Sequence, residues 1–203
     1  MDKRAWLKYF AVVLIAFSIH SSAVIMIPVF FIVRRKAWSV TTFAVVFFSL
    51  LTALLFDAFL PQFLETIKET DYAIYEQRQW FTAGIEKGSS IVRVAVMAVP
   101  LVIAWLAKPS VAKLGKTGDI LVNLAVVNIA FYIVSLYNWI FARFAIYTGI
   151  YFIVLLCWLV SNSFRQRDKK IVYLACILLF GAYFWAVRYS IAGYASEYIK
   201  GVF

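Results

Sequence analysis

The chain is poor in the residues that metal sites, disulfides and most catalytic centres need. Its 203 residues include only two cysteines, one histidine and ten acidic residues. Cys157 and Cys176 both fall within expected apolar helices, where small apolar fillers are a better interpretation than a disulfide or a metal pair. The sequence has no glycine-rich phosphate loop, no metal-ligand spacing and no serine–histidine–acid arrangement. It therefore predicts no metal site.

Apolar residues dominate instead. They make up 65% of the chain, aromatic residues make up 19%, and the mean hydropathy is +0.87. Too few polar residues remain to cover a globule, and the apolar stretches recur at membrane-spanning length. The net charge of +10 comes from basic residues in short loops, where the positive-inside bias and anionic lipid head groups explain it. We expect a polytopic protein of the lipid bilayer with no nucleic-acid partner.

The first apolar run, 5–33, is interrupted near its centre by Ser18 and by the segment 20–22. Basic clusters lie at both of its ends, and such clusters stay on the cytoplasmic side, so the run is expected to enter the membrane and return. Residues 6–19 and 22–33 are each too short to cross without tilting or local thinning. The prediction is a hairpin of two short helices with His20 at the turn. The alternative is one tilted helix, which would place the densest basic clusters outside.

The rest of the chain predicts five crossings. They cover residues 38–60, 90–107, 119–137, 143–160 and 171–189. With the hairpin, these make an all-α, polytopic bundle of six or seven membrane helices, a single transmembrane domain over 1–203. The long connection, 61–89, is more acidic than basic, so it is expected to face outward and to carry an amphipathic helix. Such a loop lines or covers a site, or is simply a solvated cap.

Ionisable residues inside the crossings are the next source of information, because a charge in hydrocarbon costs at least about 2.5 kcal/mol. Asp57, Arg93, Arg143 and Arg188 all fall toward the expected outer ends of their helices. Arginine suits phosphate or pyrophosphate because its planar fork donates two hydrogen bonds at once. The four residues therefore indicate an outward-facing anionic pocket. The alternatives are that each arginine snorkels alone, above all Arg93 and Arg188, and that Asp57 forms a structural ion pair.

Arg143 opens an expected helix after a short outer turn, four residues before Tyr147. This spacing predicts one common helix face and a contact pair for phosphate and sugar.

Three segments resemble the EpsG family of bacterial exopolysaccharide synthesis, which is related to Wzy-type O-antigen polymerases. Residues 9–28, with His20-Ser21-Ser22-Ala23, resemble the family's FH-x-SA segment. Residues 143–147 resemble a second family element. The outer loop with Tyr72 and Tyr75 is similar in placement to a third. The family's proteins are longer, so the chain is expected to be a C-terminal half, as a fragment or a truncated gene, with an activity that is then incomplete.

The resemblance implies a multi-pass glycosyltransferase of the bacterial plasma membrane. It would join oligosaccharide units carried on polyprenyl pyrophosphate at the outer face, without a soluble cofactor and alongside other polysaccharide assembly proteins. Arg143 would stabilise the departing pyrophosphate, and His20 or Asp57 would accept a proton, since histidine titrates near neutral pH. His20 could instead hydrogen-bond its neighbours only. Further substrate contacts are expected from the following residues: Arg93, Tyr147, Tyr72, Tyr75 and Arg188.

Two other functions compete with this one, a transporter or flippase for lipid-linked saccharides and a non-catalytic subunit of an assembly complex. A transporter needs polar groups that continue through the membrane. The expected inner halves of the helices, such as 104–107 and 151–159, are almost wholly apolar, with Asn123 and Asn128 as the main exceptions. This pattern favours the polymerase.

Overall fold

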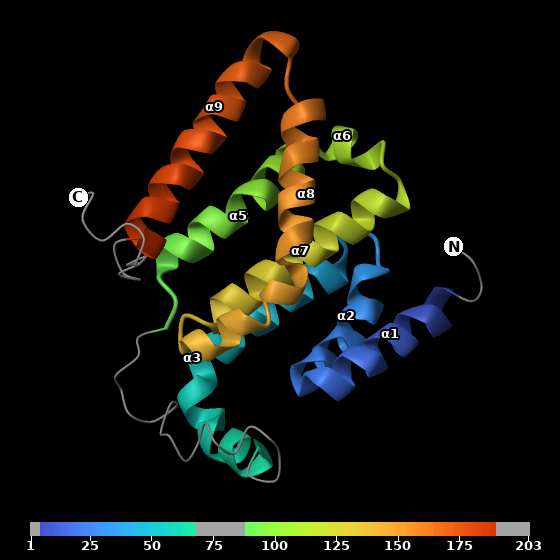
Figure 1. The fold of residues 1–203 in the computed structure, drawn as a ribbon, viewed down its shortest axis with the longest axis vertical. Helices are drawn as coiled ribbons and strands as arrows, with labels where there is room; N and C mark the ends of the chain where they lie inside the picture. The colour runs from blue at the N-terminus through green and yellow to red at the C-terminus, as the bar shows by residue number, and fades with distance from the viewer. Residues whose placement is uncertain (1–4, 68–87, 190–203) are drawn as a thin grey trace, which may run out of the picture. The chain divides into compact units, whose positions relative to one another are not determined.

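The computed structural model describes residues 5–67 and 88–189, apart from the side chains of residues 57, 67 and 187–189. Every regular element in this part of the chain is a helix, which confirms the predicted all-helical class (Figure 1). The chain divides into two compact units, residues 1–159 and 160–203. The single transmembrane domain over 1–203 stays a prediction.

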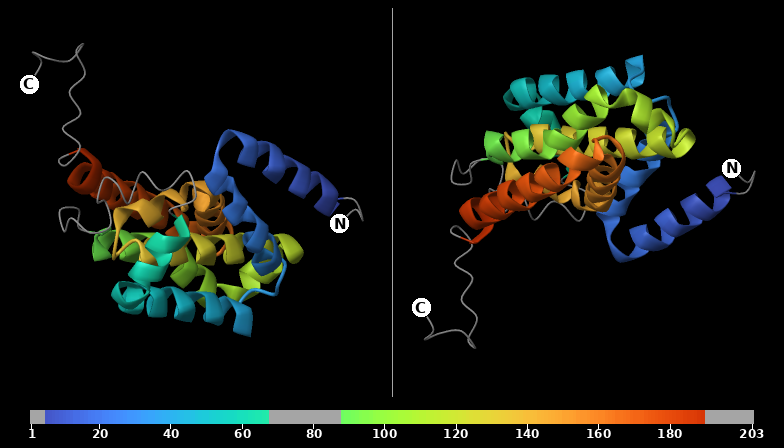
Figure 2. Two further views of the ribbon diagram at one scale, coloured as in Figure 1. Left: turned by 90° about the horizontal axis from the view of Figure 1, so that it is seen from below. Right: turned by 90° about the horizontal axis from the view of Figure 1, so that it is seen from above.

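The N-terminal segment forms two helices rather than one tilted helix. Helix α1 (Ala5–Ile19) ends at His20, whose extended backbone (φ −144°, ψ 109°) precedes the 3₁₀ helix η1 (Ser21–Ile25) and helix α2 (Met26–Val33). The chain reverses there, so that α1 and α2 come into contact. The Tyr9 hydroxyl of α1 donates a hydrogen bond to the Met26 carbonyl of α2 at 2.7 Å. Figure 2 shows this hairpin, and His20 lies at its turn between α1 and η1, as predicted.

Helix α3 (Val40–Ile67) is longer than the predicted crossing 38–60 and is sharply bent. Its two parts, 40–56 and 58–66, meet at 96°. Pro61 accounts for the bend, because it lacks an N–H group and its ring clashes with the carbonyl four residues earlier, that of Asp57. The first residues of the predicted outer loop 61–89, up to Ile67, therefore belong to α3, and the amphipathic helix expected in that loop stays a prediction. Residues 68–87 lie outside the described part.

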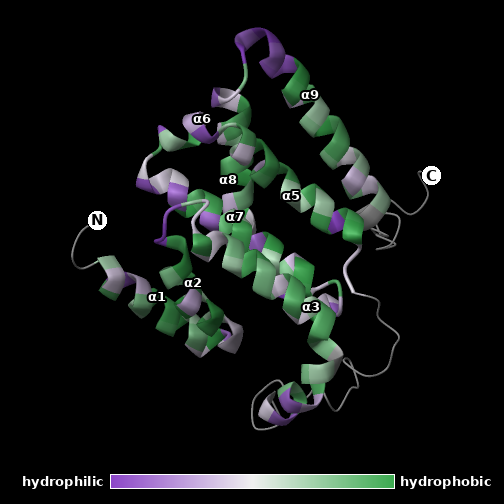
Figure 3. Cartoon of the chain, turned by 180° about the vertical axis from the view of Figure 1, so that it is seen from behind, coloured by the Kyte–Doolittle hydropathy of each residue, from purple (hydrophilic) through white to green (hydrophobic). Residues whose placement is uncertain are grey.

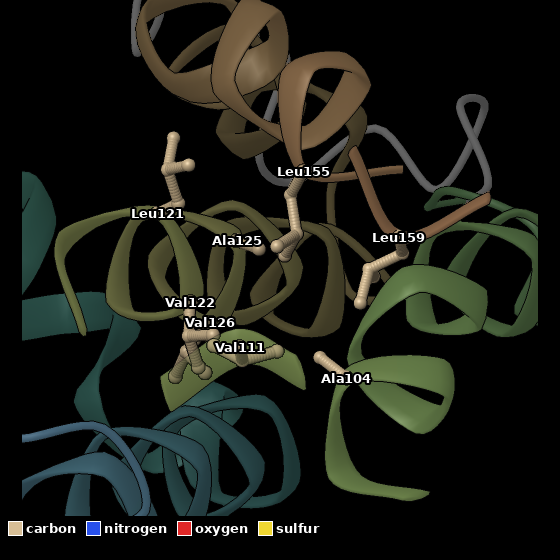
Figure 4. Packing of buried hydrophobic residues seen from close by; sticks show 8 residues of the cluster. All are labelled: Ala104, Val111, Leu121, Val122, Ala125, Val126, Leu155 and Leu159. Atoms are coloured by element: carbon tan, nitrogen blue, oxygen red, sulfur yellow. The ribbon is translucent and has the colours of Figure 1, made fainter. Parts of the chain in front are cut away.

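Helix α7 (Lys116–Val134) is the centre of the first unit. Helices α2, α3 and α5 (Ile91–Leu106) pack against it, and α6 (Lys108–Ala112) leads into it. Residues 121–130 of α7 are all buried, so the helix is enclosed on every side. In the core of this unit, Leu155 points toward Ala125 of α7 (Figure 4).

Two more segments complete the described chain. The 3₁₀ helix η2 (Trp139–Arg143) and helix α8 (Ile146–Asn162) follow α7. In the second unit, α9 (Gln166–Tyr183) continues into the π-helix η3 (Phe184–Tyr189) and contains no buried residue. Hydrophilic residues lie mostly at helix ends and connections (Figure 3).

The number of membrane crossings is only partly supported. By length and composition, two of the described helical segments, Lys116–Val134 and Gln166–Ala186, are long and apolar enough to cross, or three if the bent α3 is one span. The apolar helices at 5–19, 21–33, 91–106 and 146–162 are shorter. Six or seven crossings therefore stay a prediction, because a short helix spans only where the bilayer thins.

Candidate functional site

The turn of the hairpin and the segment from η2 to α8 line one pocket of about 370 Å³. Three of the predicted site residues, His20, Arg143 and Tyr147, lie in its lining. They come from segments that are more than a hundred positions apart in the chain. The remaining lining residues are as follows: Ser22, Ile140, Phe144 and Ile146.

Ser22 links the two sides of this pocket. Its Oγ lies 2.6 Å from the Tyr147 Oη and 3.3 Å from the His20 Nδ1. The first contact joins residues 125 positions apart and is partly buried, so it fixes η1 against the beginning of α8. His20 itself is exposed to solvent.

The Ser22 hydroxyl carries one proton, so it can donate to only one of its two neighbours. If Ser22 donates to Tyr147, it accepts from the Nδ1–H of His20, and Nε2 is left as a proton acceptor. If Tyr147 donates to Ser22, the serine donates to Nδ1, and Nε2 carries the proton as a donor. The same three residues thus allow His20 Nε2 either to accept a proton or to donate a hydrogen bond.

Arg143 is held by η2. The Asn138 side chain begins this 3₁₀ helix by accepting a hydrogen bond from the Ile140 N–H at 2.9 Å. Arg143 is the last residue of η2, and its guanidinium lies over the ring of Trp139, the first residue of η2, 4.5 Å from the ring centroid. Arginine remains protonated at any physiological pH, so the pocket carries a permanent positive charge at this edge.

The prediction that Arg143 and Tyr147 share one helix face is wrong. Arg143 ends η2, whereas Tyr147 lies in the first turn of α8, which begins at Ile146. The backbone between them makes 3₁₀-type hydrogen bonds, such as that from the Tyr147 N–H to the Phe144 carbonyl at 3.3 Å. The two side chains still line the same pocket.

A buried polar contact anchors this segment to α7. The Asn128 side-chain amide donates to the Ala145 carbonyl at 2.9 Å and to the Thr148 Oγ1 at 3.0 Å. Asn128 and Thr148 are almost completely inaccessible to solvent, so both groups depend on these bonds. The Phe131 ring of α7 also lies 5.7 Å from the Phe144 ring in the pocket wall. The central helix therefore determines where Arg143 and Tyr147 lie.

The other predicted site residues are not brought into the described lining of this pocket. Arg93 lies in the first turn of α5, where its guanidinium donates to the Ser89 Oγ at 3.3 Å. The side chains of Asp57 and Arg188 lie outside the described part, as do Tyr72 and Tyr75. Within residues 5–67 and 88–189, no group of three or more histidine, cysteine, aspartate or glutamate residues could hold a metal ion.

The EpsG family model matches residues 1–200. The chain belongs to the EpsG family. It is thus a membrane protein related to polysaccharide synthesis. The EpsG family is associated with polysaccharide polymerisation. No curated protein and no solved structure matches it.

In this EpsG-family chain, sequence reasoning missed Ser22 and the apolar wall of the pocket. Ser22 had a usable signal, because it is two residues from His20 within the segment that carried the resemblance. Ile140 and Phe144 had none, since apolar residues flank every helix end of such a chain. Asn128 was noted only as a polar exception, and its role as the anchor of α8 follows from its burial.

Proposed function

We propose that this EpsG-family protein is a polymerase that joins oligosaccharide units carried on polyprenyl pyrophosphate, at the outer face of the bacterial plasma membrane. The observation that carries the proposal is the pocket in which His20, Arg143 and Tyr147 meet. A cation, a proton acceptor and a tyrosine beside an apolar wall are the groups that transfer from a lipid pyrophosphate needs.

In the proposed reaction a hydroxyl oxygen of the acceptor sugar forms a bond to the anomeric carbon of the donor. The bond from that carbon to the pyrophosphate oxygen breaks, and its electron pair leaves with the lipid pyrophosphate. The hydroxyl proton goes to His20 Nε2, in the state where Nδ1–H donates to Ser22. Arg143 binds the negative charge that develops on the pyrophosphate, and this interaction strengthens as the bond breaks.

The wall of the pocket suits an amphiphilic substrate. Ile140, Phe144 and Ile146 are apolar and border the polar groups. They would contact the first isoprene unit or the apolar face of a sugar, while Tyr147 contacts its hydroxyls. We keep Asp57 in the proposal as an alternative proton acceptor to His20. We also keep four residues as further substrate contacts: Arg93, Arg188, Tyr72 and Tyr75. The other polysaccharide assembly proteins are proposed as partners on the same basis.

The transporter alternative has less support. A transport path needs polar groups along the helices, and Asn123 and Asn128 were the main candidates. Both are 1% exposed and use their amides internally, Asn123 on the Arg35 carbonyl at 2.6 Å and Asn128 on the Ala145 carbonyl. Groups that hold the fold in this way are unavailable to a passing saccharide, which favours a site open to one side.

The test is complementation of a strain that lacks the gene, with the intact gene carrying His20→Ala or Arg143→Ala. Lipid-linked and polymerised glycans are then separated on a gel. We expect single repeat units to accumulate while the protein persists in the membrane at its normal level. Arg165→Ala is the matched control, because this exposed arginine lies outside the pocket. Unchanged chain length in both pocket variants would disprove the proposed site.

A further inference from the structure

A second pocket, of about 440 Å³, lies where α2 ends and α7 begins. It is lined by Arg34 and Lys36 from the connection after α2, by Lys116 and Asp119 from the first turn of α7, and by two apolar residues, Val33 and Ile120. Three cations and one carboxylate therefore border it. None of these residues belongs to the site described above.

The basic connection is held in place by polar groups of α7. The Ala37 N–H donates to the Asp119 Oδ1 at 2.8 Å, and the Asn123 amide donates to the Arg35 carbonyl at 2.6 Å. Asp119 thus uses one of its oxygens to fix the backbone beside Lys36. These hydrogen bonds hold the backbone of two distant segments together, so their basic side chains border one pocket.

The surroundings of the cations are apolar. Val33 is buried with Val29, Leu124 and Val127 in a cluster between α2 and α7, and Ile120 packs against it. One turn earlier in α2, Phe31 is 59% exposed, and with Arg34 it lines a smaller neighbouring pocket of about 290 Å³. Positive charge thus gives way to exposed apolar surface over a few residues along α2.

We propose that this pocket binds the phosphate head group of an anionic glycerophospholipid, with an acyl chain along the exposed face of α2. Arg34 offers a planar fork for two phosphate oxygens, and Lys36 and Lys116 add point charges. The first turn of α7 contributes the positive end of a helix dipole on the same side. Basic pockets between helices at a membrane surface are suited to acidic lipid head groups, and the neighbouring apolar surface favours a lipid over free phosphate.

The test uses the purified intact protein in a neutral detergent and measures lipid binding by native mass spectrometry. The probes are phosphatidylglycerol, phosphatidylcholine with the same acyl chains, and inorganic phosphate as a competitor. The pocket variant is Arg34→Gln with Lys116→Gln. Its control is Lys113→Gln with Arg165→Gln, which removes the same residue types from exposed positions outside the pocket.

We expect phosphatidylglycerol to bind better than phosphatidylcholine and the pocket variant to weaken its binding about 30-fold, the scale for two basic side chains at an anionic surface. The control should bind like the unaltered protein. Equal weakening in the control would overturn the proposal, because net charge alone would then explain binding. Displacement of the lipid by inorganic phosphate would overturn it too, in favour of a soluble anion. The single substitution Lys116→Gln, at an exposed position, gives the same answer if the double variant misfolds.

Discussion

The contact between Ser22 and Tyr147 can be measured by a double-mutant cycle. Tyr147→Phe removes the hydroxyl and keeps the ring, and Ser22→Ala removes the other partner. A neutral hydrogen bond contributes about 0.5–1.5 kcal/mol net, and comparable bonds within membranes average roughly 0.6 kcal/mol. The partners are 2.6 Å apart and partly buried, so we expect a coupling free energy of about 0.5–1.5 kcal/mol. The double variant should then be scarcely less stable than the less stable of the two single variants.

The assay is reversible unfolding of the purified protein in mixed micelles with increasing denaturing detergent. Ser18→Ala combined with Tyr147→Phe is the control cycle, because the Ser18 hydroxyl donates to the Ile15 carbonyl in its own helix. This control should be additive, as independent sites are. Additive free energies in the Ser22 cycle as well would refute the hydrogen bond, and with it the two states derived for His20.

Three further predictions concern backbone approach, the buried anchor and the cation. Gly88→Ala should destabilise the protein by at least about 2 kcal/mol in the same unfolding assay, since a Cβ there would lie 1.8 Å from the Leu136 carbonyl oxygen. The control is Gly149→Ala, which should be neutral or slightly stabilising because a Cβ there would meet nothing within 4 Å. Asn128→Leu should cost about 1–3 kcal/mol in that assay and shorten the glycans, because it leaves the beginning of α8 unanchored. Arg143→Lys should lower polymer yield by about tenfold or more, because it keeps the charge and loses the two-pronged contact; a yield equal to that of the unaltered protein would argue against pyrophosphate binding by Arg143.

Much of the helical arrangement could be predicted from local signals. The polar residues around His20 interrupt an apolar run, and the structure turns the chain there. The bend of α3 also had a signal, since Pro61 must disturb the carbonyl of residue 57, although the sequence interpretation took the proline as the end of the helix. The number of crossings was harder to predict, because apolar length alone fixes neither tilt nor bilayer thickness.

Three of the residues that line the candidate pocket were named from the sequence, but their geometry was not predicted. Arg143 and Tyr147 were paired through a helix spacing that the 3₁₀ turn replaces, because the Asn138 cap begins a tighter helix after α7. The meeting of Ser22 with Tyr147 depends on how α1 and α2 pack on the rest of the unit. Such tertiary contacts leave no periodic trace in the sequence, so they could only be learned from the structure.

The central claim is that His20 and Arg143 form one polymerising site. The most direct measurement supplies the purified intact protein, in liposomes, with a labelled polyprenyl-pyrophosphate oligosaccharide and no nucleotide sugar. The account predicts that the label moves into longer chains with release of lipid pyrophosphate, and that His20→Ala and Arg143→Ala both stop this while Arg165→Ala does not. Polymer formation that persists in both pocket variants would contradict it.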